Sequence, residues 1–184
     1  MAASTYPSTQ YFASRFVISA GCILFRKQQS SEALEICILH DRNKNEWLLP
    51  KGRKDCGEPI DAAAIRETFE ETGYPCELLP CRMPTRAPRP GVNAKDAVAV
   101  VDGLIEPFAV IVRDQGPRGI KLVYWYIARA TGAEKVLGTQ TEWETFDSQF
   151  VPADEADEML TFQGDRETVR QALLIVRDGN MGDI

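Results

Sequence analysis

The stretch GRKDCGEPIDAAAIRETFEETGY, residues 52–74, carries the most informative pattern in this chain. Residues 60–72 have the apolar spacing of a helix, and Gly73 follows at the position where a left-handed residue ends many helices. We therefore predict a helix over 60–72, preceded by a glycine-rich loop. On a helical wheel at about 100° per residue, glutamates occupy one side of this helix, and the opposite side carries Ala62, Ile65, Phe69 and Thr72.

Glu67, Glu70 and Glu71 share a sector of about 100° on the predicted helix. Like charges three or four residues apart cost roughly a few tenths of a kcal/mol per pair, so the cluster needs a counter-charge. Arg66 lies one turn before Glu70 and supplies part of it, while Glu58 in the preceding loop adds a further negative group. A divalent cation would balance the rest, and oxygen ligands without His or Cys favour Mg²⁺ or Mn²⁺ over zinc. An ordinary solvated acidic face is the alternative that this pattern leaves open.

The whole stretch resembles the Nudix box, in which a glycine, five residues, a glutamate and seven residues precede the pattern REUxEExGU, where U is a bulky apolar residue. All the fixed positions are filled here at the required spacing, by Gly52, Glu58, Arg66, Glu67, Glu70, Glu71 and Gly73. Thr68 and Tyr74 stand at the two U positions and depart from the pattern. Flanking segments that resemble the family extend the likeness over about residues 16–177: AGCILFR, WLLPKG, KLVYWYIARA and PADEADEMLTFQGDRETVRQAL.

The remaining pattern mixes short strands with a few helices, which favours an α+β or α/β/α sandwich over a regular parallel βαβ arrangement. The resemblance implies the Nudix αβα sandwich, with a mixed β-sheet between helices. We expect a flexible leader over 1–14, a Nudix hydrolase domain over 15–178 and a C-terminal tail over 179–184. Periodicity predicts strands over 16–25, 35–40, 47–49, 76–79, 108–112 and 121–130, and helices over 154–160 and 165–177.

Composition narrows the class of protein. The chain has 184 residues with 21 basic and 27 acidic side chains, a formal charge of −6, and 44% hydrophobic residues, so one domain can bury a sufficient core without disulfides. No apolar run approaches the ~20 residues of a membrane span, and the N-terminus does not resemble a secretory signal. We expect a cytoplasmic or nuclear protein that binds neither membrane nor nucleic acid, in an oligomeric state that the sequence does not specify.

The cysteines and the lone histidine exclude several chemistries. The five cysteines include no C-x-x-C pair, which argues against a disulfide scaffold and a zinc cluster, and we expect them to be buried or incidental thiols. His40 is the single histidine, which leaves little room for a Ser-His-Asp or Cys-His mechanism. Any metal in this protein is therefore expected to be held by oxygen.

The resemblance implies Mg²⁺-dependent hydrolysis of a pyrophosphate linkage by attack of water on phosphorus, with Mn²⁺ as a substitute metal. By position in the motif, Glu67, Glu70 and Glu71 would bind metal and act in catalysis, with the Lys51 carbonyl as a further ligand. Arg66 would orient a glutamate by an ion pair.

The base that takes the proton from water would be one of these glutamates or a carboxylate from a later loop. Glu142 and Glu144, which flank Trp143, are the candidates, although TEWETF also reads as exposed positions of a strand.

Residues outside the box bear on the substrate. Lys51 in LPKG places an ammonium beside the predicted metal site, which suits an additional phosphate. Gly52, in the substrate-binding segment, lets the loop turn tightly. Further basic residues would extend a rim that favours a polyanion: Arg26, Arg53, Lys54, Arg82, Arg86, Arg89 and Lys95. Aromatic residues for stacking on a base are available, although alternate members of a strand usually belong to the core: Tyr124, Trp125, Tyr126 and Trp143.

Three hypotheses about function remain open from sequence. The first is a pyrophosphohydrolase of a nucleoside diphosphate derivative or a dinucleoside polyphosphate, such as diadenosine tetraphosphate. The second is a diphosphoinositol polyphosphate phosphohydrolase, and both have a phosphorylated small molecule as partner. The third is a Nudix domain that binds a ligand without turnover. The sequence also leaves open whether residues 84–103 form an ordered lid or a loop.

Overall fold

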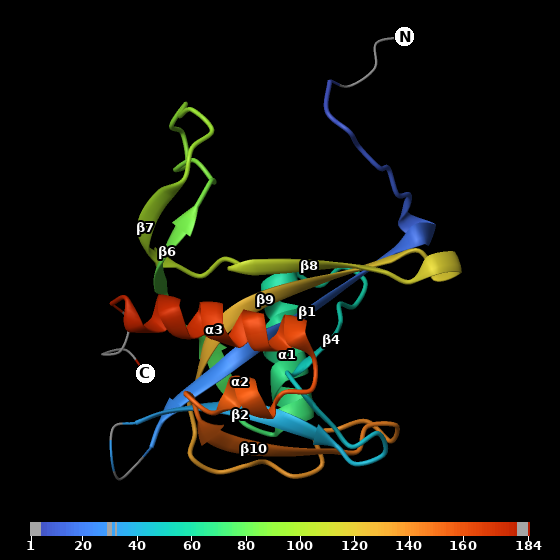
Figure 1. Ribbon diagram of the computed structural model, residues 1–184, viewed down its shortest axis with the longest axis vertical. Helices are drawn as coiled ribbons and strands as arrows, with labels where there is room; N and C mark the ends of the chain where they lie inside the picture. Colours follow the sequence, from blue (N-terminus) through green and yellow to red (C-terminus); the bar gives the residue numbers. More distant parts are fainter. Residues whose placement is uncertain (1–4, 29–30, 32, 180–183) are drawn as a thin grey trace.

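A mixed β-sheet lies at the centre of the protein in the computed structural model, which describes residues 5–28, 31, 33–179 and 184 (Figure 1). Within these residues it has eight strands in the order β10-β2-β1-β9-β5, with β3 paired to β2, β4 to β1 and β8 to β9. The strands are β1 (Phe16–Lys27), β2 (Leu34–Asp41), β3 (Glu46–Leu48), β4 (Lys51–Arg53), β5 (Cys76–Leu78), β8 (Ala109–Asp114), β9 (Ile120–Ala130) and β10 (Phe146–Pro152).

The two longest strands, β1 and β9, lie side by side and run parallel, from the pair Phe16 and Ile120 to the pair Phe25 and Arg129. The other pairs in this sheet are antiparallel. Strands buried on both faces read as nearly continuous apolar runs, which explains why FVISAGCILF and LVYWYIA were recognisable from sequence.

Helices cover both faces of the sheet, which confirms the α+β class and the mixed sheet between helices. On one face, α1 (Ile60–Thr72) packs through Ala63 and Ala64 against Ala20 and Cys22 of β1. On the other face, α2 (Ala156–Met159) and α3 (Gln163–Arg177) enclose a larger core, and Figure 1 shows α3 in front of the sheet with α1 behind it. No helix in the described part of the chain is long and apolar enough to cross a membrane.

The predicted helix over 60–72 is confirmed, and Gly73 ends it with φ 78° as its N–H donates to the Phe69 carbonyl. The side of the helix that faces the protein differs from a simple apolar face. Ala62 is exposed, Ile65 and Phe69 are half-buried, and the buried residues are Ala63, Ala64, Glu67, Thr68, Glu71 and Thr72. Two of the three glutamates therefore lie against the sheet instead of facing open solvent.

Thr68, which departs from the Nudix pattern, has a structural role in this position. Its side-chain oxygen accepts a hydrogen bond of 3.0 Å from the Cys22 N–H, and the residue is fully buried. Along this edge, β1 pairs with β4 at residues 19–21 and with β2 at residues 25–27, so Cys22 lies between the two pairings. A hydroxyl here satisfies a buried backbone donor that a leucine or valine would leave unpaired.

Several elements differ from the sequence-based expectation. β4 and β10 were not predicted, and TEWETF is a turn that only enters β10 at Phe146. The segment 84–103 forms neither a simple loop nor a lid over the glutamates, because β6 (Cys81–Thr85) and β7 (Ala99–Leu104) pair as a separate small sheet that projects from the main one (Figure 1). Two short 3-10 helices complete the described elements: η1 (Ala13–Arg15) and η2 (Gly116–Arg118).

The predicted leader 1–14 and tail 179–184 fall in part on residues 1–4 and 180–183, which lie outside the described residues. All five cysteines are within the described chain and none forms a disulfide there.

Candidate active site

The acidic face of α1 lies directly beneath β4, and the two are joined by a hydrogen bond. Oε2 of Glu71 accepts the Lys51 N–H at 2.6 Å, and both Glu67 and Glu71 are less than 10% exposed. Gly52 makes this approach feasible, because a Cβ there would lie 1.7 Å from Oε2 of Glu67. The sequence predicted a tight turn at Gly52, but the residue lies in β4, and the structural reason for glycine is this close contact with a carboxylate.

Burial changes the proton affinity of these carboxylates. Removal from water raises the pKa of Glu71 to about 8, although the Lys51 ammonium and its backbone N–H act in the opposite direction. Burial also raises the pKa of Glu67, and the neighbouring Arg66 offsets part of that effect. The negative charges of these two buried carboxylates are poorly compensated, so binding of a cation beside them would be strongly favoured.

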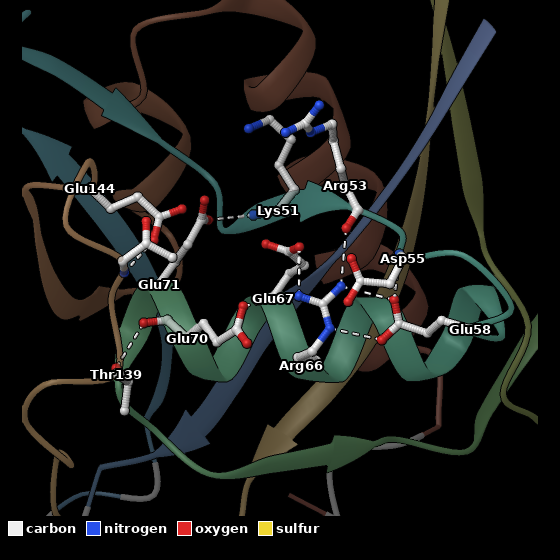
Figure 2. A network of polar contacts seen from close by, with 11 residues as sticks. Lys51, Arg53, Asp55, Glu58, Arg66, Glu67, Glu70, Glu71, Thr139 and Glu144 are labelled. Carbon is white, nitrogen blue, oxygen red and sulfur yellow. Dashed lines mark hydrogen bonds and ion pairs between the residues drawn. The ribbon is translucent and has the colours of Figure 1, made fainter. Parts of the chain in front are cut away.

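Arg66 organises the acidic residues around the start of α1. Its Nε and Nη2 donate to the two oxygens of Glu58 at 2.8 and 2.9 Å, and Nη1 donates to Oε1 of Glu67 at 2.8 Å and to Oε2 of Glu70 at 3.0 Å. The guanidinium also contacts the Arg53 carbonyl at 3.0 Å. The ion pair holds the pKa of Glu58 down at about 2. Arg66 thus connects the loop, β4 and two glutamates of α1 (Figure 2).

The donor atoms around these glutamates fit a hard divalent cation. Within the described residues, Arg66 and the Lys51 N–H occupy one oxygen of each glutamate, and no hydrogen bond reaches Oε2 of Glu67, Oε1 of Glu70 or Oε1 of Glu71. These are all carboxylate oxygens, the ligands that Mg²⁺ and Mn²⁺ prefer. As they stand, no three His, Cys, Asp or Glu side chains in the described chain form a ready-made metal cluster. The carboxylates would have to turn toward a bound ion.

β4 separates these carboxylates from a group of cations. Figure 2 shows the side chains of Lys51 and Arg53 rising from β4 on the side away from α1. Lys51 and Arg53 pair with Gly21 and Ser19 of β1, and these in turn pair with Trp125 and Val123 of β9. Because alternate residues of a strand share a face, the side chain of Lys121 lies on the same side of the sheet.

A cavity of about 690 Å³ brings both groups together, and its lining includes the cations Lys51, Arg53 and Lys121 with the glutamates of α1. Burial, and then the nearby charge of Lys51, lowers the pKa of Lys121 to about 8. The sequence analysis did not single out Lys121. A sequence signal for Lys121 was available, because this residue begins the predicted strand KLVYWYIARA. That strand pairs with the strand that precedes the motif.

A loop over residues 139–146 closes the other side of the cavity and carries Glu142, Trp143 and Glu144 into its lining. Thr139 and Gln140 tie this loop to the end of α1: the Thr139 hydroxyl donates to the Glu70 carbonyl at 2.8 Å, and Nε2 of Gln140 donates to the Glu71 carbonyl at 3.0 Å. The sequence analysis missed both anchors.

Glu144 is the better placed of the two later carboxylates. It accepts the Thr141 N–H at 3.0 Å, and its negative charge contributes to the raised pKa of both Glu67 and Glu71. Figure 2 shows its carboxylate beside that of Glu71. Glu142 is exposed at the rim.

The structure does not bring every predicted basic residue to this cavity. Arg26 lies near the far end of β1, where it pairs with Glu35 at 2.6 Å and stacks over Phe150 at 3.7 Å. Arg86 and Arg89 are exposed on the segment between β6 and β7, and Arg86 is paired with Asp96. The predicted rim for these three residues is wrong, because strand direction and the projecting hairpin carry them away from the glutamates.

Comparison with known proteins identifies the class. The NUDIX domain model matches residues 15–172, so the chain belongs to the Nudix family. An 8-oxo-(d)GTP phosphatase of Mycolicibacterium smegmatis is 25% identical over 182 residues, which cover 90% of this chain and 47% of that protein. A mouse diphosphoinositol polyphosphate phosphohydrolase 3-alpha is 34% identical over 59 residues, covering 32% of this chain and 35% of that protein.

Solved structures show the same fold. A Caenorhabditis elegans Ap4A hydrolase in a binary complex superposes with a TM-score of 0.58 at 20% identity, over 86% of this chain and 97% of that one. The NUDIX domain of Shewanella oneidensis NrtR, complexed with ADP ribose, gives a TM-score of 0.55 at 16% identity over 92% and 93% of the two chains. This chain spans less than half the length of the first curated relatives that it matches.

Proposed function

We propose that this protein hydrolyses a pyrophosphate linkage in a nucleoside polyphosphate, with a dinucleoside polyphosphate such as diadenosine tetraphosphate as the preferred substrate. One observation carries the proposal: a single cavity places the glutamates of α1 on one side of β4 and the cations Lys51, Arg53 and Lys121 on the other. A chain of phosphates that follows β4 would meet both groups. The fold shared with the C. elegans Ap4A hydrolase supports this choice.

Each residue has a defined task in this proposal. Glu67, Glu70, Glu71 and the Lys51 carbonyl would hold Mg²⁺, or Mn²⁺ in its place. Such an ion would supply positive charge against the phosphate oxygens and would make water easier to deprotonate. Arg66 positions Glu67 and Glu70 through the ion pairs described above. Glu144 accepts the proton from the attacking water, because its carboxylate lies beside that of Glu71 (Figure 2).

The cations act on the substrate. The Lys51 ammonium and the Arg53 guanidinium bind phosphate oxygens beyond the linkage that is cleaved, and Lys121 contributes a third positive charge. Without these cations, the net charge of −6 on the protein would repel the phosphates of the substrate and oppose binding.

An inositol pyrophosphate is the second candidate substrate. The same cations would bind it, and the mouse diphosphoinositol polyphosphate phosphohydrolase resembles part of this chain. A domain that binds such ligands without turnover is the third candidate. The intact set of glutamates, two of which are buried, favours an enzyme, because pure binding gives no reason to retain their electrostatic cost.

Product analysis tests these candidates. The protein is incubated with diadenosine tetraphosphate, a diphosphoinositol polyphosphate or ADP-ribose, with Mg²⁺ or with EDTA, and the products are separated. We expect ATP and AMP from the first substrate, with Mg²⁺ only. Glu70→Gln and Glu71→Gln should each lower kcat by at least about 100-fold, because each removes charge from the metal ligands. Unchanged phosphate release in both variants would contradict the assignment.

Lys51→Gly tests the choice of a polyphosphate. The variant should raise KM for diadenosine tetraphosphate more than KM for ADP-ribose, because the longer substrate has more phosphates for the ammonium to bind. Asp154→Asn is a matched surface control, since Asp154 is exposed and pairs with Arg177 away from the cavity. An equal rise in KM for both substrates would show that Lys51 does not determine the preference for a polyphosphate.

A further inference from the structure

The hairpin formed by β6 and β7 is poorly covered by the rest of the described chain. Cys81 and Met83 at its base are 1% and 3% exposed and belong to the core that α3 covers. Beyond Thr85 the hairpin projects from the main sheet (Figure 1), and residues 86–100 are all exposed. A two-stranded hairpin in water is at best marginally stable by itself, so a further surface packed on its distal half would stabilise it.

One face of this projecting hairpin is apolar. Val98 and Val100 are 67% and 53% exposed, and they lie on the same face because they are two residues apart in extended chain. Pro84 is the partner of Val100 in the neighbouring strand and is exposed as well. Contiguous exposed apolar side chains are typical of surfaces that bind another protein, whereas single ones are common on any protein.

A groove of about 460 Å³ lies between this face and α3. The hairpin contributes Met83, Pro84 and Val100 to its lining, and α3 contributes Leu174 and Ile175. Leu174 is 64% exposed, although most other apolar residues of α3 are buried. The groove is thus continuous with the apolar face of the hairpin. We call these five residues, together with Val98, the hairpin surface.

The distal segment of the hairpin is basic in an otherwise acidic protein. Residues 86–97 contain Arg86, Arg89 and Lys95 but only one acid, Asp96, while the whole chain has a net charge of −6. Arg86 and Asp96 pair with each other. In the part of the chain that the structure describes, Arg89 and Lys95 form no ion pair, so this segment carries a net positive charge.

The surface of α2 and α3 has the opposite charge. Residues 154–178 contain seven acidic and three basic side chains, and the exposed Asp178 lies in the lining of the groove itself. Within one copy the tip of the hairpin points away from α3 (Figure 1). The basic tip and the acidic helices therefore complement each other only when they belong to two different molecules.

We propose that the hairpin surface binds a second copy of this chain in a dimer with two-fold symmetry. The hairpin of each copy lies in the groove of the other, so Val98 and Val100 contact Leu174 of the partner subunit. The basic segment 86–97 lies against the acidic surface of α2 and α3 in that subunit. In a two-fold contact the same patch serves both molecules, so each of these attractions occurs twice. The inference concerns assembly and does not depend on the proposed function.

Sedimentation velocity over a series of protein concentrations tests the proposal. The wild type should form dimers, and Val100→Asp should raise the dimer Kd at least about tenfold, because the contact would bury an unpaired charge. Leu174→Asp should have the same effect from the other half of the contact. Val112→Asp is the matched control, since Val112 is 63% exposed in β8 of the main sheet. Urea denaturation shows that the variants are folded.

Charge provides a second measurement. The double variant Arg89→Glu and Lys95→Glu should raise the dimer Kd roughly three- to tenfold at low salt, with a smaller difference at high salt, because salt screens the attraction between tip and helices. A wild type that stays monomeric up to ~200 µM would overturn the proposal. So would a dimer that withstands both Val100→Asp and Leu174→Asp, or one that Val112→Asp weakens to the same extent.

Discussion

Glu71 links stability to catalysis through a single carboxylate. The residue is 4% exposed, and its folded pKa of about 8 lies above the ordinary value of 4.5. Between these two values the folded chain keeps a proton that the unfolded chain has lost, so the stability of the metal-free protein falls as pH rises through this window. A bound cation reverses the balance by stabilising the ionised form.

Glu71→Gln should therefore stabilise the protein in EDTA at alkaline pH while it abolishes activity. The amide keeps an oxygen for the Lys51 N–H and removes the buried charge. We expect the free energy of unfolding to exceed that of the wild type by up to about 5 kcal/mol above pH 8, and by almost nothing near pH 4.5, as measured by urea denaturation.

Glu134→Gln, at an exposed glutamate, is the control for this comparison and should show no such pH dependence. If Glu71→Gln and the wild type had parallel stability profiles across the window, Glu71 would not be the buried, uncompensated carboxylate that the structure indicates.

At the level of elements, the end of α1 and the loop over 139–146 form one unit. Gln140 joins them: its Nε2 donates to the carbonyls of Glu71 and Phe146, and its Oε1 accepts the Phe146 N–H at 3.1 Å. A short side-chain bridge of this kind holds Glu144 close to Glu71, although residues 139–145 contain no helix or strand.

Gln140→Ala should release the loop. Loss of these hydrogen bonds is expected to lower the free energy of unfolding by about 1–3 kcal/mol and to lower kcat more than it raises KM, because Glu144 would no longer be held beside the metal ligands. Steady-state kinetics and limited proteolysis within 139–146 measure the two effects. Gln149→Ala, at an exposed position of β10, provides the comparison. Unaltered kcat would show that Glu144 does not depend on this anchor.

At the level of the whole molecule, charge is distributed unevenly. The chain is acidic overall, with a net charge of −6, yet Lys51, Arg53 and Lys121 gather at one cavity. A polyanion is therefore attracted locally and repelled elsewhere, and salt screens both effects over about 10 Å at moderate ionic strength.

Lys121→Met should raise KM for diadenosine tetraphosphate at low salt by roughly three- to tenfold and make KM less dependent on salt than in the wild type. The change should leave folding intact, since burial already lowers the pKa of this lysine to about 8 and an apolar side chain suits the site. KM measured across a series of salt concentrations tests this. An identical salt dependence in both proteins would place Lys121 outside the path of the phosphates.

The sequence by itself determined the helix over 60–72, its end at Gly73, the apolar central strands and the family. These features are local, because helical spacing, caps and apolar runs are set by neighbours along the chain, and the Nudix pattern lies within one stretch of 23 residues. The burial of Glu67 and Glu71 was not visible in this way, since it depends on how β4 crosses α1.

Only the tertiary structure decided which basic residues belong to the cavity. Lys121 reaches it because β9 runs parallel to β1, while Arg26 is carried to the other end of β1 and Arg86 to the projecting hairpin. Such relations join residues many positions apart, and strand register and direction, which no single segment specifies, determine them.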